Sequence, residues 1–339
     1  MTGLKLFRKF FVITACLLSI LFSGCEKALQ LKSPEAGHTA VFEELWQVID
    51  QRYSLFSVKG VDWQESYRHF HAQVTNDMPE HDFFRVLSNM LDSLKDGHIT
   101  LISPSDSFTY DGFYKLYPVN FNYGNILNNY LRNNYKTSGP LIYKITEGVG
   151  YIYYNSFAND ISDEQINTII NEMKDTKGLM IDVRNNTGGN TANADKLFSR
   201  FISAPTLVKY EKIKKGTGHN DFYDPQPHYV SPATITYGKP VAVLINRKCF
   251  SACNDFVLYM SQLPNVKLFG DQTGGGGSIP QQYILANGWS IQYSASLTLS
   301  ADKIPVENGI MPDESITITP IQESNGIDII IETAFQYLH

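Results

Sequence analysis

The stretch PVAVLINRKCFSACNDF, residues 240–256, decides the fold. Its first six residues form an unbroken apolar run, which is the pattern of a strand buried on both faces of a sheet. From Phe256 onward, apolar residues recur at the spacing of a helix face. Ser251 therefore stands where a strand passes into a helix. A serine there either caps the helix or acts as a nucleophile beside free backbone N–H groups, and this stretch leaves both readings open.

The second half of the chain alternates strand and helix patterns. Buried strands are predicted at GVGYIYYNSF (148–157), GLMIDVR (178–184) and VKLFG (266–270). A helix predicted from residue 163 to 174, after a capping Ser162, separates the first two strands. This alternation predicts an α/β layer fold, which we place at residues 146–339.

The first half is predicted to be helical and then irregular. Apolar residues at steps of three and four predict three helices, which form a helical bundle over residues 38–102. Asp62 is predicted to cap the second helix, with Glu65 closing a capping box. Residues 103–145 are rich in Tyr, Phe and Asn without a steady period, and we treat them as a connecting segment. Residues 211–235 are polar and predict a surface loop.

The N-terminus has the layout of an export signal. KLFRKFFVITACLLSILFSGC, residues 5–25, has a basic start, an apolar stretch too short for a membrane span, and small residues before Cys25. Its LFSGC ending resembles a bacterial lipoprotein signal, in which Cys25 is acylated. We therefore expect a signal peptide at residues 1–24, a tether at 25–37, and an exported chain anchored by lipid to the periplasmic or outer-membrane face of a bacterial membrane. An anchor helix or a simple secretory signal is the alternative.

Composition restricts the partners and cofactors. The chain has 339 residues, of which 43% are hydrophobic, so it can bury a sizeable core. Its net charge of −6 argues against a nucleic acid or an anionic membrane surface as the main partner. Cys249 and Cys253 lack companion ligands for zinc, and we read them as packing residues, with a strained disulfide as the alternative. We expect no metal and no cofactor. Three histidines are read as solvated: His69, His71 and His81.

Three further motifs contain residues that could carry chemistry. Gly188 and Gly189 follow a strand in IDVRNNTGGN, where glycine allows close backbone approach, as an oxyanion donor requires. GDQTGGGGS, residues 270–278, is either a flexible loop or a backbone surface for a ligand. His98 follows the third helix, and Glu307 lies in the turn ENGIMPD. Taken singly, each has an ordinary reading as a turn or a helix end.

Together these motifs resemble a known family. DGHITLISP, GVGYIYYNSF, KGLMIDVRNNTGG, VAVLINRKCFSACNDF, GDQTGGGGS and ENGIMPD follow one another as in the C-terminal processing, or tail-specific, serine peptidases. The helical bundle before His98 resembles the one that precedes the tricorn protease core. The resemblance spans residues 38–320 and implies a crotonase/ClpP-like α/β peptidase core that acts without a cofactor.

The resemblance also implies roles for individual residues. The better-known branch pairs its serine with a lysine 25 residues later, but that position is Gly276 here. The tricorn-type branch implies Ser251 as nucleophile, His98 as base and Glu307 as support. Gly97 departs from that branch, where a serine links the histidine to the glutamate. Two further groups are implied, an oxyanion hole at Gly188, Gly189 and Ala252 and a substrate cleft at Gly274, Gly275 and Gly276.

The expected function is that of a serine endopeptidase acting on peptides or unfolded protein segments. About 50 residues separate His98 from the strand at Gly150, too few for the family's tail-recognising PDZ module and its linkers. A substrate peptide is expected to bind as an added strand. The alternative is a catalytically weak or inactive member that binds a peptide or an apolar ligand, and the scaffold alone does not choose between them.

Overall fold

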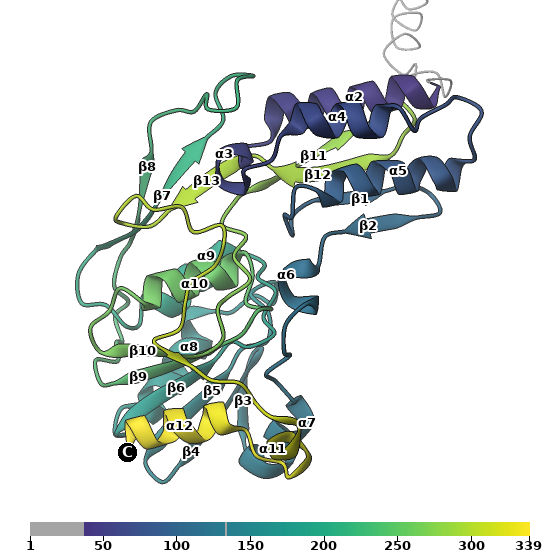
Figure 1. Ribbon diagram of the computed structural model, residues 1–339. Coiled ribbons are helices and arrows are strands. Elements are labelled where there is room, and N and C mark those ends of the chain that lie inside the picture. Colours follow the sequence, from purple (N-terminus) through teal and green to yellow (C-terminus); the bar gives the residue numbers. More distant parts are fainter. Residues whose placement is uncertain (1–36, 133) are drawn as a thin grey trace, which may run out of the picture.

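The computed structural model describes residues 37–132 and 134–339, and Figure 1 shows its two parts. Helices and a small sheet form an upper unit, and a larger layered unit lies below it. This confirms the predicted α/β class with an N-terminal helical region. The signal peptide, Cys25 and nearly all of the tether lie outside the described residues. Within them, no helix is long and apolar enough to cross a membrane.

The helical unit forms where the apolar periodicity predicted it. Its helices are α2 (His38–Arg52), α3 (Phe56–Lys59), α4 (Trp63–His71) and α5 (Glu80–Asp92). The Asp62 side chain accepts the Glu65 N–H, as predicted for a cap. The Glu65 carboxylate pairs with Arg68, so it does not close a capping box. The apolar faces meet in a core that also contains Ile291 and Tyr293 from much later in the chain.

A four-stranded antiparallel sheet completes this core. Its order is β11 (Pro280–Ile284), β12 (Ser290–Ser294), β1 (Thr100–Ile102) and β2 (Ser107–Thr109). Thr100 lies opposite Gln292, so strands far apart in sequence are neighbours. The helical unit predicted at 38–102 therefore also contains residues 280–294, which the sequence places in the α/β core by prediction.

The core is built on a seven-stranded sheet. Its order is β14 (Glu314–Ser315), β10 (Val266–Gly270), β9 (Val241–Ile245), β6 (Gly178–Asp182), β5 (Val149–Tyr153), β4 (Leu141–Thr146) and β3 (Lys136–Ser138). The strands from β14 to β5 are parallel, and β4 and β3 are antiparallel. The four predicted buried strands are present. The predicted start at residue 146 differs from the structure, because β3 and β4 belong to this sheet.

Helices cover both faces of this sheet. One face packs against α8 (Asp163–Met173), α9 (Thr191–Phe198) and α10 (Ala252–Met260). The other face packs against α12 (Ile329–Leu338), which lies across the sheet in Figure 1. Ser162 caps α8 in a full capping box.

Shorter elements connect these layers. They are α6 (Gly112–Lys115), α7 (Tyr123–Asn125), the π-helix η1 (Ile126–Leu131) and α11 (Pro320–Ser324). A three-stranded sheet has the order β13 (Ser296–Leu299), β7 (Thr206–Ile213) and β8 (Gln226–Val230). The prediction of a loop at 211–235 is wrong in part, because β8 lies within it.

A buried arginine joins the central sheet to α12. Arg184 is fully buried two residues after the end of β6, and its guanidinium donates to Asp182 at 2.9 and 2.6 Å. It also lies 2.8 Å from a carboxylate oxygen of Asp328, whose side chain caps α12. A third contact reaches the carbonyl of Asn120 in the connecting segment. One cation thus ties β6, α12 and the connecting segment together.

Replacing Arg184 by Met is expected to destabilise the fold strongly. Two buried carboxylates would lose their shared partner, which costs about 3–5 kcal/mol. Equilibrium unfolding in urea measures the change in the free energy of unfolding. Arg85→Met is the matched control, because Arg85 pairs with Asp82 at the surface and is worth about 0–1 kcal/mol. Equal losses in the two variants would contradict this assignment.

Candidate active site

Ser251 occupies a strained turn between β9 and α10. Its backbone has φ 56° and ψ −125°, a region that costs a non-glycine residue on the order of 1–3 kcal/mol. Its hydroxyl accepts no helix N–H, so Ser251 is at the N-cap position without acting as a cap. Its own N–H donates to the Gly275 carbonyl at 2.9 Å, which fixes the turn. The strained backbone therefore leaves the Ser251 hydroxyl free of the helix end, instead of using it to cap α10.

His98 faces this hydroxyl. Its Nε2 lies 3.2 Å from Ser251 Oγ, although 153 residues separate them. Asp96 accepts the His98 N–H at 2.8 Å, and Gln292 donates to the His98 carbonyl at 3.1 Å. The ring also packs on Phe250 at a centroid distance of 4.7 Å. The histidine loop is thus held from both the helical unit's sheet and the serine turn.

The charge state of His98 suits a base. The side chain is buried, and this burial lowers the pKa of the imidazole below its usual 6.5, against the opposing charges of Asp96 and Asp255. Positive Lys59 adds to the lowering. The neutral form therefore dominates at pH 7. For Nε2 to accept a proton, Nδ1 must carry the hydrogen, and among the described residues no partner takes it.

Glu307 lies near the histidine loop but contacts another group. One carboxylate oxygen is 3.0 Å from Lys59 Nζ, and the other accepts the Gly277 N–H at 3.1 Å. No direct bond to His98 is formed. Burial raises the pKa of Glu307 to about 7, and the nearby charge of Asp96 adds to this, while Lys59 opposes it. The structure thus brings Ser251 and His98 into contact and leaves Glu307 paired with Lys59.

Of the two glycines predicted for the oxyanion hole, Gly188 lies against the serine and Gly189 lies against Phe157 and Ala158. A Cβ on Gly188 would meet the Phe250 carbonyl at 2.5 Å and Ser251 Cβ at 2.8 Å, so only glycine fits. The Gly188 N–H already donates to the Asn186 side chain at 2.9 Å. The N–H groups of Ala252 and Gly189 have no acceptor among the residues the structure describes. The free amide of Ala252 directly follows Ser251, and that of Gly189 follows Gly188, which lies against the serine.

The glycine loop predicted to form a cleft is largely used within the protein. Gly275 accepts from Ser251, and Gly276 N–H donates to the Glu307 carbonyl at 3.1 Å. Gly275 and Gly276 are buried, whereas Gly274 borders a cavity of about 300 Å³. The loop therefore joins the serine turn to the glutamate turn.

That cavity lies on the glutamate side of the site, where Gly97, Phe250, Lys59 and Glu307 line it. At Gly97, a Cβ would lie 2.7 Å from both the Phe113 and Phe250 rings, which stack on each other. The aromatic pair thus leaves no space for a side chain at this position. The difference from the tricorn-type pattern is built into the local packing.

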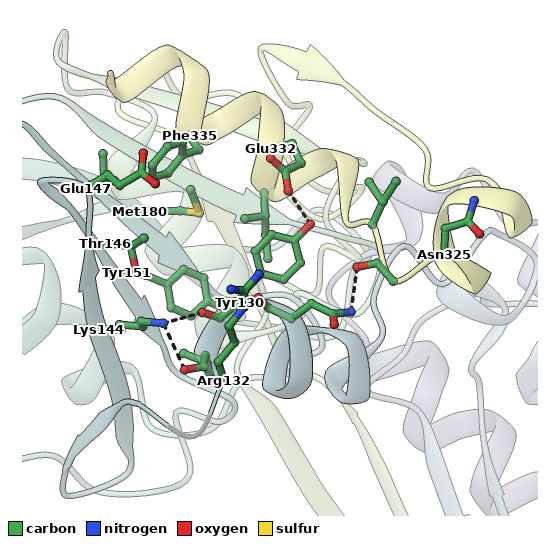
Figure 2. Close-up of a pocket in the computed structure, with 16 residues that line it drawn as sticks. Tyr130, Arg132, Lys144, Thr146, Glu147, Tyr151, Met180, Asn325, Glu332 and Phe335 are labelled. Carbon is green, nitrogen blue, oxygen red and sulfur yellow. Dashed lines mark hydrogen bonds between the residues drawn. The ribbon is translucent and has the colours of Figure 1, made fainter.

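A second cavity, of about 490 Å³, lies on the α12 face of the sheet, away from Ser251. Figure 2 shows Tyr151 and Met180 of the sheet facing Phe335 of α12 across it. Lys144 at its edge donates to the carbonyl of Tyr130, so this cation closes the end of η1. The polar groups drawn there are mainly paired within the protein.

Sequence reasoning missed two residues of this site, and for the cysteines it favoured the reading that the structure bears out. Asp96 was given no role in the site, although an aspartate two residues before a histidine is able to accept its N–H. Lys59 had no signal beyond ending a short helix. Cys249 and Cys253 are buried free thiols, as the packing reading predicted. In the described part of the chain, no cluster of three or more metal-binding side chains occurs.

Comparisons with known proteins agree with the architecture. Residues 148–316 match peptidase family S41, and residues 34–92 match the tricorn protease C1 domain. The crystal structure of the tricorn protease shares the fold, with a TM-score of 0.56 and 16% identity over 89% of this chain and 36% of that chain.

Two relatives are more similar in sequence. A putative peptidase from Parabacteroides merdae is 40% identical, with a TM-score of 0.86, over 90% of this chain and 97% of that chain. A probable CtpA-like serine protease from Staphylococcus aureus is 29% identical over 55% of this chain and 36% of that protein. The chain thus spans about a third of the length of the curated relatives it matches. With these similarities across both units, the chain belongs to peptidase family S41, the family of the C-terminal processing peptidases.

Proposed function

We propose that this chain is a serine endopeptidase that hydrolyses peptides or unfolded protein segments through Ser251 and His98. The observation that carries the proposal is the 3.2 Å contact between Ser251 Oγ and a buried, neutral imidazole. Membership of family S41 supports the same class of reaction. Position 276 is glycine, so a lysine base in the glycine loop is not available.

The reaction would proceed by acyl transfer. Ser251 Oγ attacks the peptide carbonyl while His98 Nε2 takes its proton and later returns it to the leaving amine. Water then attacks the acyl-enzyme with His98 again as base, which releases the acid and restores the serine. The strained turn supports this role, because it holds the hydroxyl toward the histidine before substrate arrives.

The free N–H groups of Ala252 and Gly189 are suited to bind the oxyanion of the tetrahedral intermediate. Such a donor contributes about 3 kcal/mol to transition-state stabilisation. The N–H of Gly188 would have to leave Asn186 to take part. Its backbone instead fixes the distance between this loop and the serine turn.

Glu307 would act through its charge. An ionised carboxylate at 307 would add negative charge to the buried region in which the imidazolium forms when Ser251 loses its proton. The absence of a direct bond means that Glu307 does not fix the imidazole tautomer. Its contribution therefore depends on being ionised, which its raised pKa of about 7 makes dependent on pH.

The substrate would bind as an added strand rather than through a tail-recognising module. Residues 103–132 and 134–148 contain β2, α6, α7, η1, β3 and β4, which join the two units and extend the core sheet. Gly274 is the member of the predicted cleft set that borders a cavity, so it is the member best placed to meet a peptide. The alternative is a binding protein with little catalysis, because Gly97 replaces the serine of the tricorn-type branch. Labelling of the serine distinguishes the two.

The lipid anchor is a separate part of the proposal. It rests on the LFSGC sequence ending at Cys25, which resembles a lipoprotein signal. Acylation there would hold the exported chain at a membrane surface.

Ser251→Ala is expected to lower the rate at which a fluorophosphonate probe labels the full chain by about 10³-fold or more, because the attacking oxygen is removed. His98→Ala should slow labelling by about 10²-fold or more. Ser261→Ala, at the other end of α10, is the control and should label normally. A folded wild-type chain without labelling would contradict the proposal and favour the binding protein; thermal unfolding checks the fold.

The labelling rate is expected to fall as pH drops through about 7. Glu307 and His98 must both be deprotonated, and Glu307 has the higher pKa, raised to about 7, while that of His98 is lowered below 6.5. Glu307→Gln removes the upper ionisation, so the acid limb should move below 6.5 and the plateau should fall. Rates measured from pH 5 to 9 test this. An unchanged limb in Glu307→Gln would exclude the proposed role of the carboxylate.

Mass spectrometry of protein expressed in bacteria with its own N-terminus is expected to find acylated Cys25 as the first residue. Cys25→Ala should move the protein from the membrane fraction to the soluble fraction, because the site of acylation is lost. An unmodified Cys25 inside a longer chain would overturn the lipid anchor without affecting the peptidase proposal.

A further inference from the structure

We propose that Lys59 is a positioning residue of the active site, and that the N-terminal helical unit completes the site by holding Glu307 ionised beside the histidine loop. The inference rests on the proposed function. Lys59 is the last residue of α3, and Gly60 in the left-handed region ends that helix. The lysine side chain is 11% exposed and that of Glu307 is 2% exposed, so the pair is shielded from water.

One ammonium group joins two parts of the site. Lys59 Nζ lies 3.0 Å from Glu307 Oε1 and donates to the Lys95 carbonyl at 3.0 Å. Lys95 immediately precedes Asp96, whose carboxylate accepts the His98 N–H. The glutamate turn and the histidine loop are therefore held to the same cation, which comes from a third segment of the chain.

The surroundings of Glu307 make this cation necessary. Burial and the charge of Asp96 both favour the protonated acid, and the ion pair with Lys59 and the Gly277 N–H oppose them. Buried Tyr53 also faces both carboxylates. With the balance giving Glu307 a pKa of about 7, loss of Lys59 shifts it upward and leaves a neutral acid at pH 7. A neutral acid no longer stabilises an imidazolium.

Lys59 does not replace His98 as the base. The contact with Ser251 Oγ is made by His98 Nε2, whereas the ammonium of Lys59 is bound to a carboxylate and a carbonyl. With its ammonium bound to these two oxygens, Lys59 makes no contact with the serine hydroxyl. Lys59 therefore acts on the reaction through Glu307, and a purely structural link between the two units is the competing interpretation.

The charges around His98 determine how the pKa of its imidazole responds when Lys59 is replaced. Asp96 and Asp255 raise the pKa of His98, and Lys59 lowers it. Removing Lys59 therefore raises the pKa of His98 through the direct charge effect and that of Glu307 through the lost ion pair. Both changes move the acid limb of the reaction to higher pH.

The first experiment compares labelling rates of the full chain and its variants between pH 5 and 9. Lys59→Met should move the acid limb up by about one pH unit or more, which lowers the rate at pH 7 about fivefold and lowers it less at pH 9. Lys59→Arg keeps the charge and should restore the limb. Lys136→Met is the matched control, because its ammonium pairs with Glu172 at the surface and does not line this cavity.

A loss of rate by the same factor at every pH, with the limb unmoved, would overturn the proposal and make Lys59 a structural link. So would an equal shift of the limb in Lys136→Met. Thermal unfolding of each variant separates these outcomes from loss of the fold. If Lys59→Met does not fold, Lys59→Arg and the titration below in Lys59→Gln decide the question.

A second measurement does not depend on catalysis. Carbon-13 NMR of protein labelled at glutamate carboxyl carbons, with the Glu307 signal identified by its loss in Glu307→Gln, gives the titration midpoint directly. The midpoint should lie near 7 in the wild type and higher in Lys59→Met and Lys59→Gln. Equal midpoints would overturn the inference. A wild type that the fluorophosphonate does not label would instead overturn the proposed function, and the carboxyl titration would still test the ion pair.

Discussion

The guanidinium of Arg184 is the interaction on which the layered unit depends most. It is buried without access to water, so its charge is tolerable only while Asp182 and Asp328 stay beside it. The loop that follows it in the chain continues to Gly188, which lies against the serine turn. The position of α12, the end of β6 and the floor of the active site are thus fixed by one set of paired charges.

The active site concentrates local conformations and charges that a protein usually avoids. Ser251 adopts a backbone region rare for a residue with a side chain, and Glu307 is buried near a second carboxylate, that of Asp96. Hydrogen bonds from several segments hold these features in place, since neither is favourable alone. Such departures from local rules are expected where function, rather than stability, selects the arrangement.

Local sequence patterns predicted the elements well and their assembly less well. The apolar run before Asn246 predicted β9 and placed Ser251 at its exit, because burial on both faces leaves a clear signature. The pairing of His98 with Ser251 came from the resemblance to a family, since no local rule connects residues so far apart. The contact of Lys59 with Glu307 was not predictable, because a lysine at a helix end usually faces water. Strands β11 and β12 were assigned to the wrong unit, since alternation does not reveal which sheet a strand joins.

The four-stranded sheet has a consequence for the order in which the protein assembles during synthesis. Strand β1 pairs with β12, and Thr100 must wait for Gln292 to leave the ribosome. At a synthesis rate of about 5–20 residues per second, that delay is roughly 10–40 s. Gln292 and Ser294 also supply hydrogen bonds to His98 and Asp96. The histidine therefore reaches its final position only after the nucleophile has already been translated, so the growing chain carries its serine before it has a complete base.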